Sequence, residues 1–131
     1  MKLLLDTHIW VWSMLEPRRI KGAVAGALSD DANERWISPI SVWELTILCD
    51  KGRVSLDSPV NIWVERSSQR SPFWLAPVNL QVALETSKIH LPHRDPADYF
   101  LAATARVFDL TLVTADEILI AANDVPTLAN R

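Results

Sequence analysis

The sequence has few of the residues on which several common classes of site depend. It contains a single cysteine, Cys49, so it forms no internal disulfide and no cysteine cluster that holds zinc. Its three glycines, Gly22, Gly26 and Gly52, cannot supply the G-x-G-x-x-G loop of dinucleotide sites or a P-loop. The usual nucleotide-binding loops are therefore excluded.

The chain also lacks a long hydrophobic run and a strong charge of either sign. No apolar stretch approaches the roughly 18 residues that span a bilayer, and Asp6 interrupts the apolar run at the N-terminus well short of a signal peptide. We therefore expect a cytoplasmic protein. The formal net charge of −3 implies no broadly basic surface. It does not exclude nucleic-acid binding, which depends on where the charges lie.

What is present is typical of a folded domain. The 131 residues are 49% hydrophobic and 22% charged, which are ordinary values for a globular protein. A chain of this length can bury a core without a disulfide or a structural metal. We expect one domain over residues 1–131.

Short apolar runs alternate with longer segments of helical character. The predicted strands are residues 2–5, 36–38, 76–78, 111–114 and 127–128. The predicted helices are 20–28, 41–51, 58–70, 80–88, 95–107 and 116–122, and 8–15 is compatible with either state. This alternation indicates an α/β fold, in which a parallel sheet carries helices on both faces.

Several helices have recognisable start signals. Ser41 and Glu44 have the spacing of a capping box. Ser58 and Asp95 each precede a proline, which suits the first turn of a helix, and Asp95 is expected to act chiefly as a cap. Gly52 suits the left-handed end of the helix that begins at Ser41.

Four acidic residues follow or begin the predicted elements at equivalent places. Asp6 and Asp116 come directly after apolar strands, while Glu44 and Asp98 are expected in first turns of helices after Pro39 and Pro96. In an open parallel sheet, ligands bind outside the carboxyl ends of the strands. We therefore expect these four acids to meet at one edge of the sheet.

Several carboxylates in one cleft repel one another. A pair about 4 Å apart costs about 4 kcal/mol at an effective dielectric constant of 20. Either some of them bind protons or a cation binds between them, and oxygen-only ligands suit Mg²⁺ or Mn²⁺. Such an ion can activate water and stabilise a phosphodiester under in-line attack, which is the chemistry of a metal-dependent nuclease. It also lets an acidic protein bind RNA locally.

The same acids have purely structural interpretations. Glu44 can serve only the capping box, Asp98 only the helix dipole and Asp116 only a helix cap. Asp6 is the hardest to explain in this way, because it directly follows a buried strand. Asp95 can support the site in addition to capping its helix.

Other polar residues near these acids are weaker candidates. Thr7 and Thr114 can orient carboxylates or water through their hydroxyls, or can be ordinary strand-end threonines. His8 can reach the site or the substrate. The three histidines, which include His90 and His93, show no H-E-x-x-H spacing, so a zinc site is disfavoured.

Two other classes of function remain open on the residues alone. A phospho-accepting receiver module also uses strand-end acids and Mg²⁺, but it needs an acidic pair near the start and a lysine after a late strand, and no lysine follows Lys88. The other is a non-catalytic interaction domain in which the acids act only as caps.

The ordered motifs nevertheless resemble those of the PIN-domain ribonucleases, and most closely the VapC toxins of type II toxin–antitoxin systems. The matching segments, which span almost the whole chain, are Leu4-Leu5-Asp6-Thr7-His8, Ser41-Val42-Trp43-Glu44-Leu45, His93-Arg94-Asp95-Pro96-Ala97-Asp98 with Ala102-Ala103-Thr104-Ala105, and Leu112-Val113-Thr114-Ala115-Asp116-Glu117. One position departs from the family pattern. Tyr99 stands where an arginine often follows the third acid.

The resemblance implies a PIN-like α/β/α sandwich around a central parallel sheet. It implies an endoribonuclease toxin that depends on Mg²⁺ or Mn²⁺, forms a homodimer and is inhibited by a cognate antitoxin. The catalytic and metal-binding acids of the family map to Asp6, Glu44, Asp98 and Asp116. We expect Asp6 and Asp98 to be the main ligands, Asp116 to assist, and Glu44 to hold a water or a second ion.

The tryptophans give an independent indication of a partner surface. Trp10 and Trp12 cannot share one helix face, so one of them is expected to be exposed. The segment around Trp43 is apolar on most of its sides, which fits burial by a partner. Alternatively, all six tryptophans belong to the core or its boundary, and Trp36 is expected in the core.

Overall fold

The computed structural model describes all 131 residues, which form a five-stranded parallel sheet with helices on both faces. The strands are β1 (Lys2–Leu5), β2 (Glu34–Ile37), β3 (Trp74–Leu75), β4 (Thr111–Thr114) and β5 (Thr127–Ala129). The α-helices are α1 (Thr7–Leu15), α2 (Gly22–Ser29), α3 (Pro39–Asp50), α4 (Val60–Arg70), α5 (Leu80–Glu85), α6 (Pro96–Val107) and α7 (Glu117–Ala121). Two 3₁₀ turns are η1 (Pro17–Arg19) and η2 (Thr86–Lys88).

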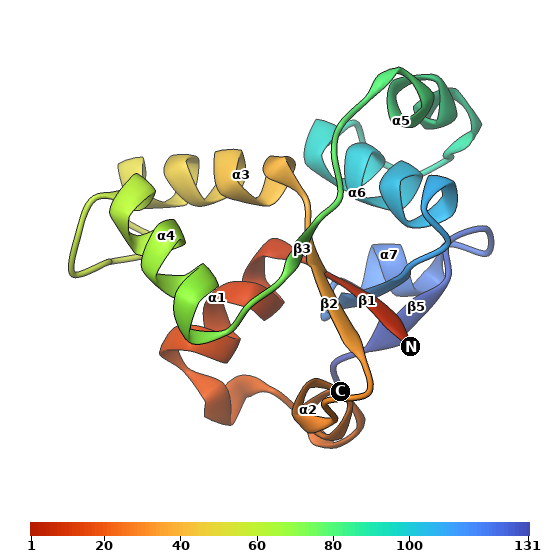
Figure 1. The fold of residues 1–131 in the computed structure, drawn as a ribbon. Coiled ribbons are helices and arrows are strands. Elements are labelled where there is room, and N and C mark those ends of the chain that lie inside the picture. The colour runs from red at the N-terminus through yellow and green to blue at the C-terminus, as the bar shows by residue number, and fades with distance from the viewer.

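The first strand lies at the centre of the sheet. The strand order is β3-β2-β1-β4-β5, and every neighbouring pair is parallel. Leu4 pairs with Trp36 of β2 and with Leu112 of β4. Because all strands run the same way, their carboxyl ends share one edge, from which α1, α3 and α7 leave β1, β2 and β4 directly (Figure 1).

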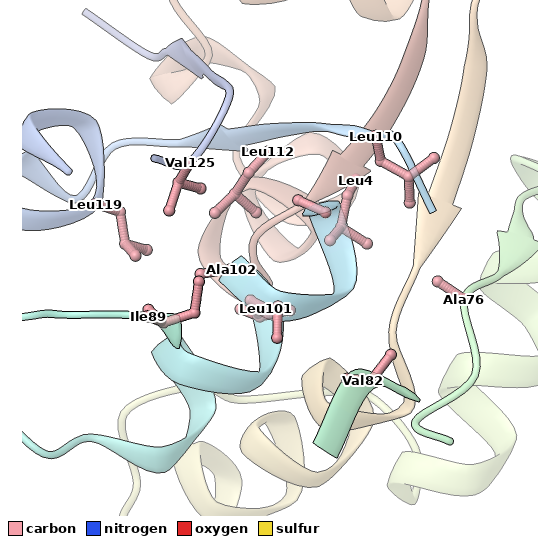
Figure 2. Packing of buried hydrophobic residues seen from close by; sticks show 12 residues of the cluster. Leu4, Ala76, Val82, Ile89, Leu101, Ala102, Leu110, Leu112, Leu119 and Val125 are labelled. Atoms are coloured by element: carbon pink, nitrogen blue, oxygen red, sulfur yellow. The ribbon is translucent and has the colours of Figure 1, made fainter. Parts of the chain in front are cut away.

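Alternate residues of the central strand pack into two separate hydrophobic cores, one on each face of the sheet. Leu3 and Leu5 pack with buried residues of α1 to α4, whereas Leu4 packs with buried residues of α5, α6 and α7. Figure 2 shows Leu4 and Leu112 on the strands with Leu101 of α6 packed below them. The two-residue period of a strand explains this division, and it confirms the predicted sandwich with helices on both faces.

Residues 8–15, whose sequence is compatible with either a strand or a helix, belong to helix α1. Asp6 is the N-cap of α1 and accepts a hydrogen bond from the Thr7 N–H, so the chain turns from strand to helix without a loop. Strands β1, β4 and β5 and helix α6 lie where the sequence predicted them. Gly52, with φ +70°, follows α3 as expected of a C-terminal glycine.

The predicted start of the helix over residues 41–51 was wrong. Helix α3 begins at Pro39, and Ser38 is its cap, since the Ser38 hydroxyl accepts a hydrogen bond from the Ile40 N–H. A capping serine followed by proline at the first helical position outweighs the capping box three residues later. Ser41 is consequently a buried helix residue, and Glu44 lies in the second turn of α3 rather than the first.

Three smaller expectations also needed correction. Helix α4 begins at Val60 without a side-chain cap from Ser58. The third strand is Trp74–Leu75 rather than 76–78, although Ala76 still donates its N–H to the Ile37 carbonyl. The predicted helix over 80–88 is divided into α5 and η2.

The tryptophans lie in different environments. Trp10 is buried and Trp12 is half-buried, so the expectation that one of this pair is exposed was wrong. Trp36 is half-buried and stacks on the exposed Trp74, so its expected place inside the core was wrong. Trp43 is 50% exposed on α3. No helix combines the length and apolar character that crossing a bilayer requires.

Candidate active site

Asp6 lies at the carboxyl end of the central strand and is held by two hydrogen bonds. Its Oδ1 accepts from the Thr7 N–H at 2.7 Å, and its Oδ2 accepts from the Thr114 hydroxyl at 2.7 Å. The residue is 8% exposed. Burial raises its pKa, the bonds from Thr114 and Thr7 lower it, and the charge of Asp116 raises it further.

Thr114 connects Asp6 to the acid after the neighbouring strand. The Thr114 hydroxyl donates to Asp6 and accepts from the Asp116 N–H at 3.0 Å. Asp116 is the N-cap of α7 and accepts from the Ile118 N–H at 2.8 Å. Asp116 therefore does serve as a cap, and it also lies near enough to Asp6 and Asp98 to raise the pKa of both carboxyl groups.

Glu44 reaches the same edge from α3. One of its carboxyl oxygens accepts a hydrogen bond from the Thr7 hydroxyl, which also lies 3.1 Å from the buried Ser41 hydroxyl. Glu44 thus contacts α1 and does not cap its own helix. Burial, followed by the charges of Asp6 and Asp95, raises the pKa of Glu44 to about 7, despite the opposing Thr7 bond.

Asp98 projects from the first turn of α6 and is 7% exposed. Its pKa is raised to about 8, first by burial and then by the charges of Asp6, Asp95, Asp116 and Glu44. The Oδ2 of Asp98 lies 3.1 Å from Nε2 of His93, a contact that sequence reasoning missed. The only signal for it was the short spacing between His93 and Asp98 across the helix start.

Asp95 acts as predicted, as the N-cap of α6. Its side chain accepts from the Ala97 N–H at 3.2 Å, and its charge raises the pKa of Glu44 and Asp98. The other weak candidates fall outside the cluster or at its margin. His8 is exposed but lies near enough to lower the pKa of Asp6, and Cys49 is half-buried with its pKa raised by burial.

The Tyr99 side chain makes its hydrogen bonds to the loop before α6 and none to the acids. Its hydroxyl donates to the carbonyl oxygens of Leu91 at 3.2 Å and His93 at 2.7 Å. The departure from the family pattern at this position therefore places a side chain against the loop before α6, and it leaves the carboxylates in place.

The structure brings the four predicted acids to one sheet edge from four elements. The donor set consists of carboxylate and hydroxyl oxygens, which suits Mg²⁺ or Mn²⁺. No three His, Cys, Asp or Glu side chains are arranged to hold a metal ion as they stand. In this arrangement Asp6, Glu44 and Asp116 each accept a hydrogen bond from a nearby protein donor.

Comparisons with known proteins agree with this arrangement. The sequence model of the PIN domain matches residues 3–125. Ribonuclease VapC22 of Mycobacterium tuberculosis is 31% identical over 120 residues, which cover 89% of this chain and 88% of that protein.

Solved structures show the same fold. VapBC2 from Rickettsia felis, bound to a DNA fragment from its promoter, has a TM-score of 0.73 at 16% identity and covers 98% of both chains. FitAcB from Neisseria gonorrhoeae has a TM-score of 0.68 at 27% identity and covers 98% of this chain and 97% of that one. These likenesses confirm the predicted α/β/α sandwich.

Proposed function

This chain belongs to the PIN domain family, and from that premise we propose that it is a VapC-type toxin, an endoribonuclease that hydrolyses RNA phosphodiester bonds. Residues 1–131 form its single PIN domain. The observation that carries the proposal is the meeting of Asp6, Glu44, Asp98 and Asp116 at one edge, where burial and then the charges of the neighbouring acids raise the pKa of Asp98 to about 8. The relative VapC22 is itself a ribonuclease.

A divalent cation, Mg²⁺ or Mn²⁺, is the counter-ion that this cluster suits. Asp6 and Asp98 would be its main ligands, and Asp116 would assist. Bound there, the ion would supply an activated water and stabilise the charge that develops on the phosphodiester. The carboxyl groups have to leave some of their present hydrogen-bond partners and turn toward the ion, and the proton on Asp98 has to be released.

Glu44 is suited to accept the proton of the attacking water. A general base works best when its pKa lies near the working pH, and burial places the pKa of Glu44 at about 7. Thr7 holds one carboxyl oxygen of Glu44 through its hydroxyl, which fixes the orientation of the group. The second oxygen remains free to receive a proton.

A pocket beside α1 supports RNA as the substrate. It has a volume of about 590 Å³ and is lined by residues that include His8, Trp12, Arg19 and Arg53. The Arg19 guanidinium lies 4.0 Å from the centre of the Trp12 ring. Guanidinium groups bind phosphates and indole groups stack on bases. His8, which lines this pocket, also lies near enough to Asp6 to lower the pKa of that carboxyl group.

The proposal includes two protein partners. Solved relatives are toxin–antitoxin complexes, some of them bound to DNA, which supports inhibition by a cognate antitoxin. The second partner is another copy of this chain, with which it forms a homodimer. The homodimer is supported by the large apolar side chains exposed on α3, β3 and α5, namely Trp43, Trp74, Leu75, Leu80 and Leu84. Contiguous apolar patches larger than a few hundred Å² on a soluble domain mark protein–protein interaction sites.

An RNA cleavage assay with and without a chelator tests the proposed function. We expect the purified protein to cut single-stranded RNA internally with Mg²⁺ or Mn²⁺, to lose that activity in EDTA, and to recover it when excess Mn²⁺ is added. A small phosphodonor is expected to leave no aspartyl phosphate on the chain. Cleavage that persists unchanged in EDTA, or an aspartyl phosphate, would refute the proposal.

A further inference from the structure

His93 makes two polar contacts with its two ring nitrogens. Its Nδ1 accepts a hydrogen bond from the Asp95 N–H at 3.1 Å, and its Nε2 lies 3.1 Å from Oδ2 of Asp98. The ring lies in the loop before α6 and its side chain is 28% exposed, whereas that of Asp98 is 10% exposed. His93 therefore covers one side of a buried carboxyl group.

The contact of Nδ1 with the Asp95 N–H determines which ring nitrogen of His93 carries the proton. A backbone N–H can only donate, so Nδ1 must present a lone pair to Asp95 and carries no proton. In the neutral ring the proton then lies on Nε2, which faces Asp98. Nε2–H therefore lies on the side of the ring that faces Oδ2 of Asp98, at an N···O distance of 3.1 Å, and Oδ1 is the oxygen left for another partner.

Tyr99 fixes the loop that presents this imidazole. Its hydroxyl donates to the main-chain carbonyl of His93 at 2.7 Å and to that of Leu91 at 3.2 Å. The two rings also meet edge to face, with centroids 6.4 Å apart. The Tyr99 side chain thus ties the loop to the first turn of α6, next to Asp98 itself.

On the basis of the proposed function, we infer that His93 is a positioning residue for the metal: Nε2–H holds Oδ2 of Asp98 so that Oδ1 faces the shared edge. Partners of this kind, which orient a ligand without touching the ion, contribute about 10- to 100-fold to metal affinity. Asp98 is the acid that most needs such a partner, because no side-chain hydrogen bond holds its carboxyl group and His93 Nε2 lies 3.1 Å from it.

Two conservative variants separate the two ring contacts. In His93→Asn, the amide oxygen can replace Nδ1 as the acceptor for the Asp95 N–H, but nothing replaces the donor to Asp98. In His93→Gln, the longer amide can place an N–H near Nε2 and restore the donor. His90→Asn is the matched control, because His90 is an exposed residue of the same loop.

The first readout is Mn²⁺ affinity, measured by calorimetric titration without RNA. We expect His93→Asn to weaken binding by about tenfold or more, and His93→Gln and His90→Asn to remain within about threefold of the wild type. Wild-type affinity in His93→Asn would overturn the inference, and so would a loss in His93→Gln as large as that in His93→Asn. If the wild type binds no divalent ion, the proposed function fails instead.

A second readout needs neither metal nor activity. Nitrogen-15 spectra of the histidine rings in the metal-free protein identify which ring nitrogen carries the proton. We expect the Nε2–H form for His93, in the wild type and in His90→Asn. The Nδ1–H form at His93 would leave Nε2 without a proton to donate to Asp98 and would overturn the inference by itself.

Discussion

Replacing Asp6 by asparagine is expected to reduce metal-dependent RNA cleavage by roughly a thousandfold or more. The reason is that a lost metal ligand forfeits several kcal/mol of transition-state stabilisation, and each 1.4 kcal/mol corresponds to about tenfold in rate. Initial rates of cleavage of a fluorescent RNA at saturating Mn²⁺ measure this effect.

The fold of the Asp6→Asn variant is expected to remain intact. Asparagine is as good an N-cap as aspartate, so its side-chain oxygen can still accept the hydrogen bond from the Thr7 N–H at the start of α1. The Thr114 hydroxyl can rotate and accept from the new amide. Asp57→Asn, at an exposed acid with a side chain 79% accessible, is the control and should keep full activity. A folded Asp6→Asn variant with wild-type cleavage would remove Asp6 from the site.

The second large effect is on stability in the absence of metal. Asp98 has a pKa of about 8 in the folded protein, against 3.8 as its ordinary value. Between these values the folded chain holds a proton that the unfolded chain releases, so the free energy of unfolding must fall as the pH rises from about 4 to about 8. Glu44, with a pKa of about 7, acts in the same direction over a narrower range.

Asp98→Asn is therefore expected to stabilise the metal-free protein at pH 8. Each pKa unit corresponds to about 1.4 kcal/mol, and because reorientation and solvent offset part of the shift, we expect a gain of about 2–4 kcal/mol. The gain should disappear near pH 4. Urea denaturation in EDTA from pH 4 to pH 9 measures it.

The control for this series is Asp31→Asn, which makes the same chemical change at an exposed position in the turn before β2. This variant should leave the pH dependence of the free energy of unfolding unaltered. Mg²⁺ should restore stability to the wild type at pH 8, by about 2.7 kcal/mol at a hundredfold excess over the dissociation constant, and should have no such effect on Asp98→Asn. A wild-type protein that is more stable at pH 9 than at pH 5 without metal would contradict the raised pKa of Asp98.

The parts of the fold that the sequence predicted best are those where local and global signals agree. Lys2–Leu5 and Thr111–Thr114 are short apolar runs ending next to an acid, and both are buried parallel strands at the centre of the sheet. Because parallel strands share a carboxyl edge, placing Asp6 and Asp116 after them was enough to place these two acids together.

The remaining differences have physical causes that no local pattern contains. Ser41 and Glu44 have the spacing of a capping box, but Thr7 of a distant helix takes both as partners because α1 and α3 leave neighbouring strands. The contact between His93 and Asp98 depends on how the loop before α6 folds back. Residue spacing does not report the contact of Thr7 with Glu44, which lie far apart in the chain, and the short spacing of His93 and Asp98 indicates only that the two residues can meet.

The shared metal site is tested most directly by paramagnetic broadening. Mn²⁺ added in substoichiometric amounts to nitrogen-15-labelled protein broadens the amide signals of residues near the bound ion. In the wild type, we expect the signals around Asp6, Glu44, Asp98 and Asp116 to disappear together. In the Asp98→Asn variant, the same signals should remain visible. Broadening spread over exposed acids such as Asp31, or confined to just one of the four, would show that these carboxylates do not bind one ion.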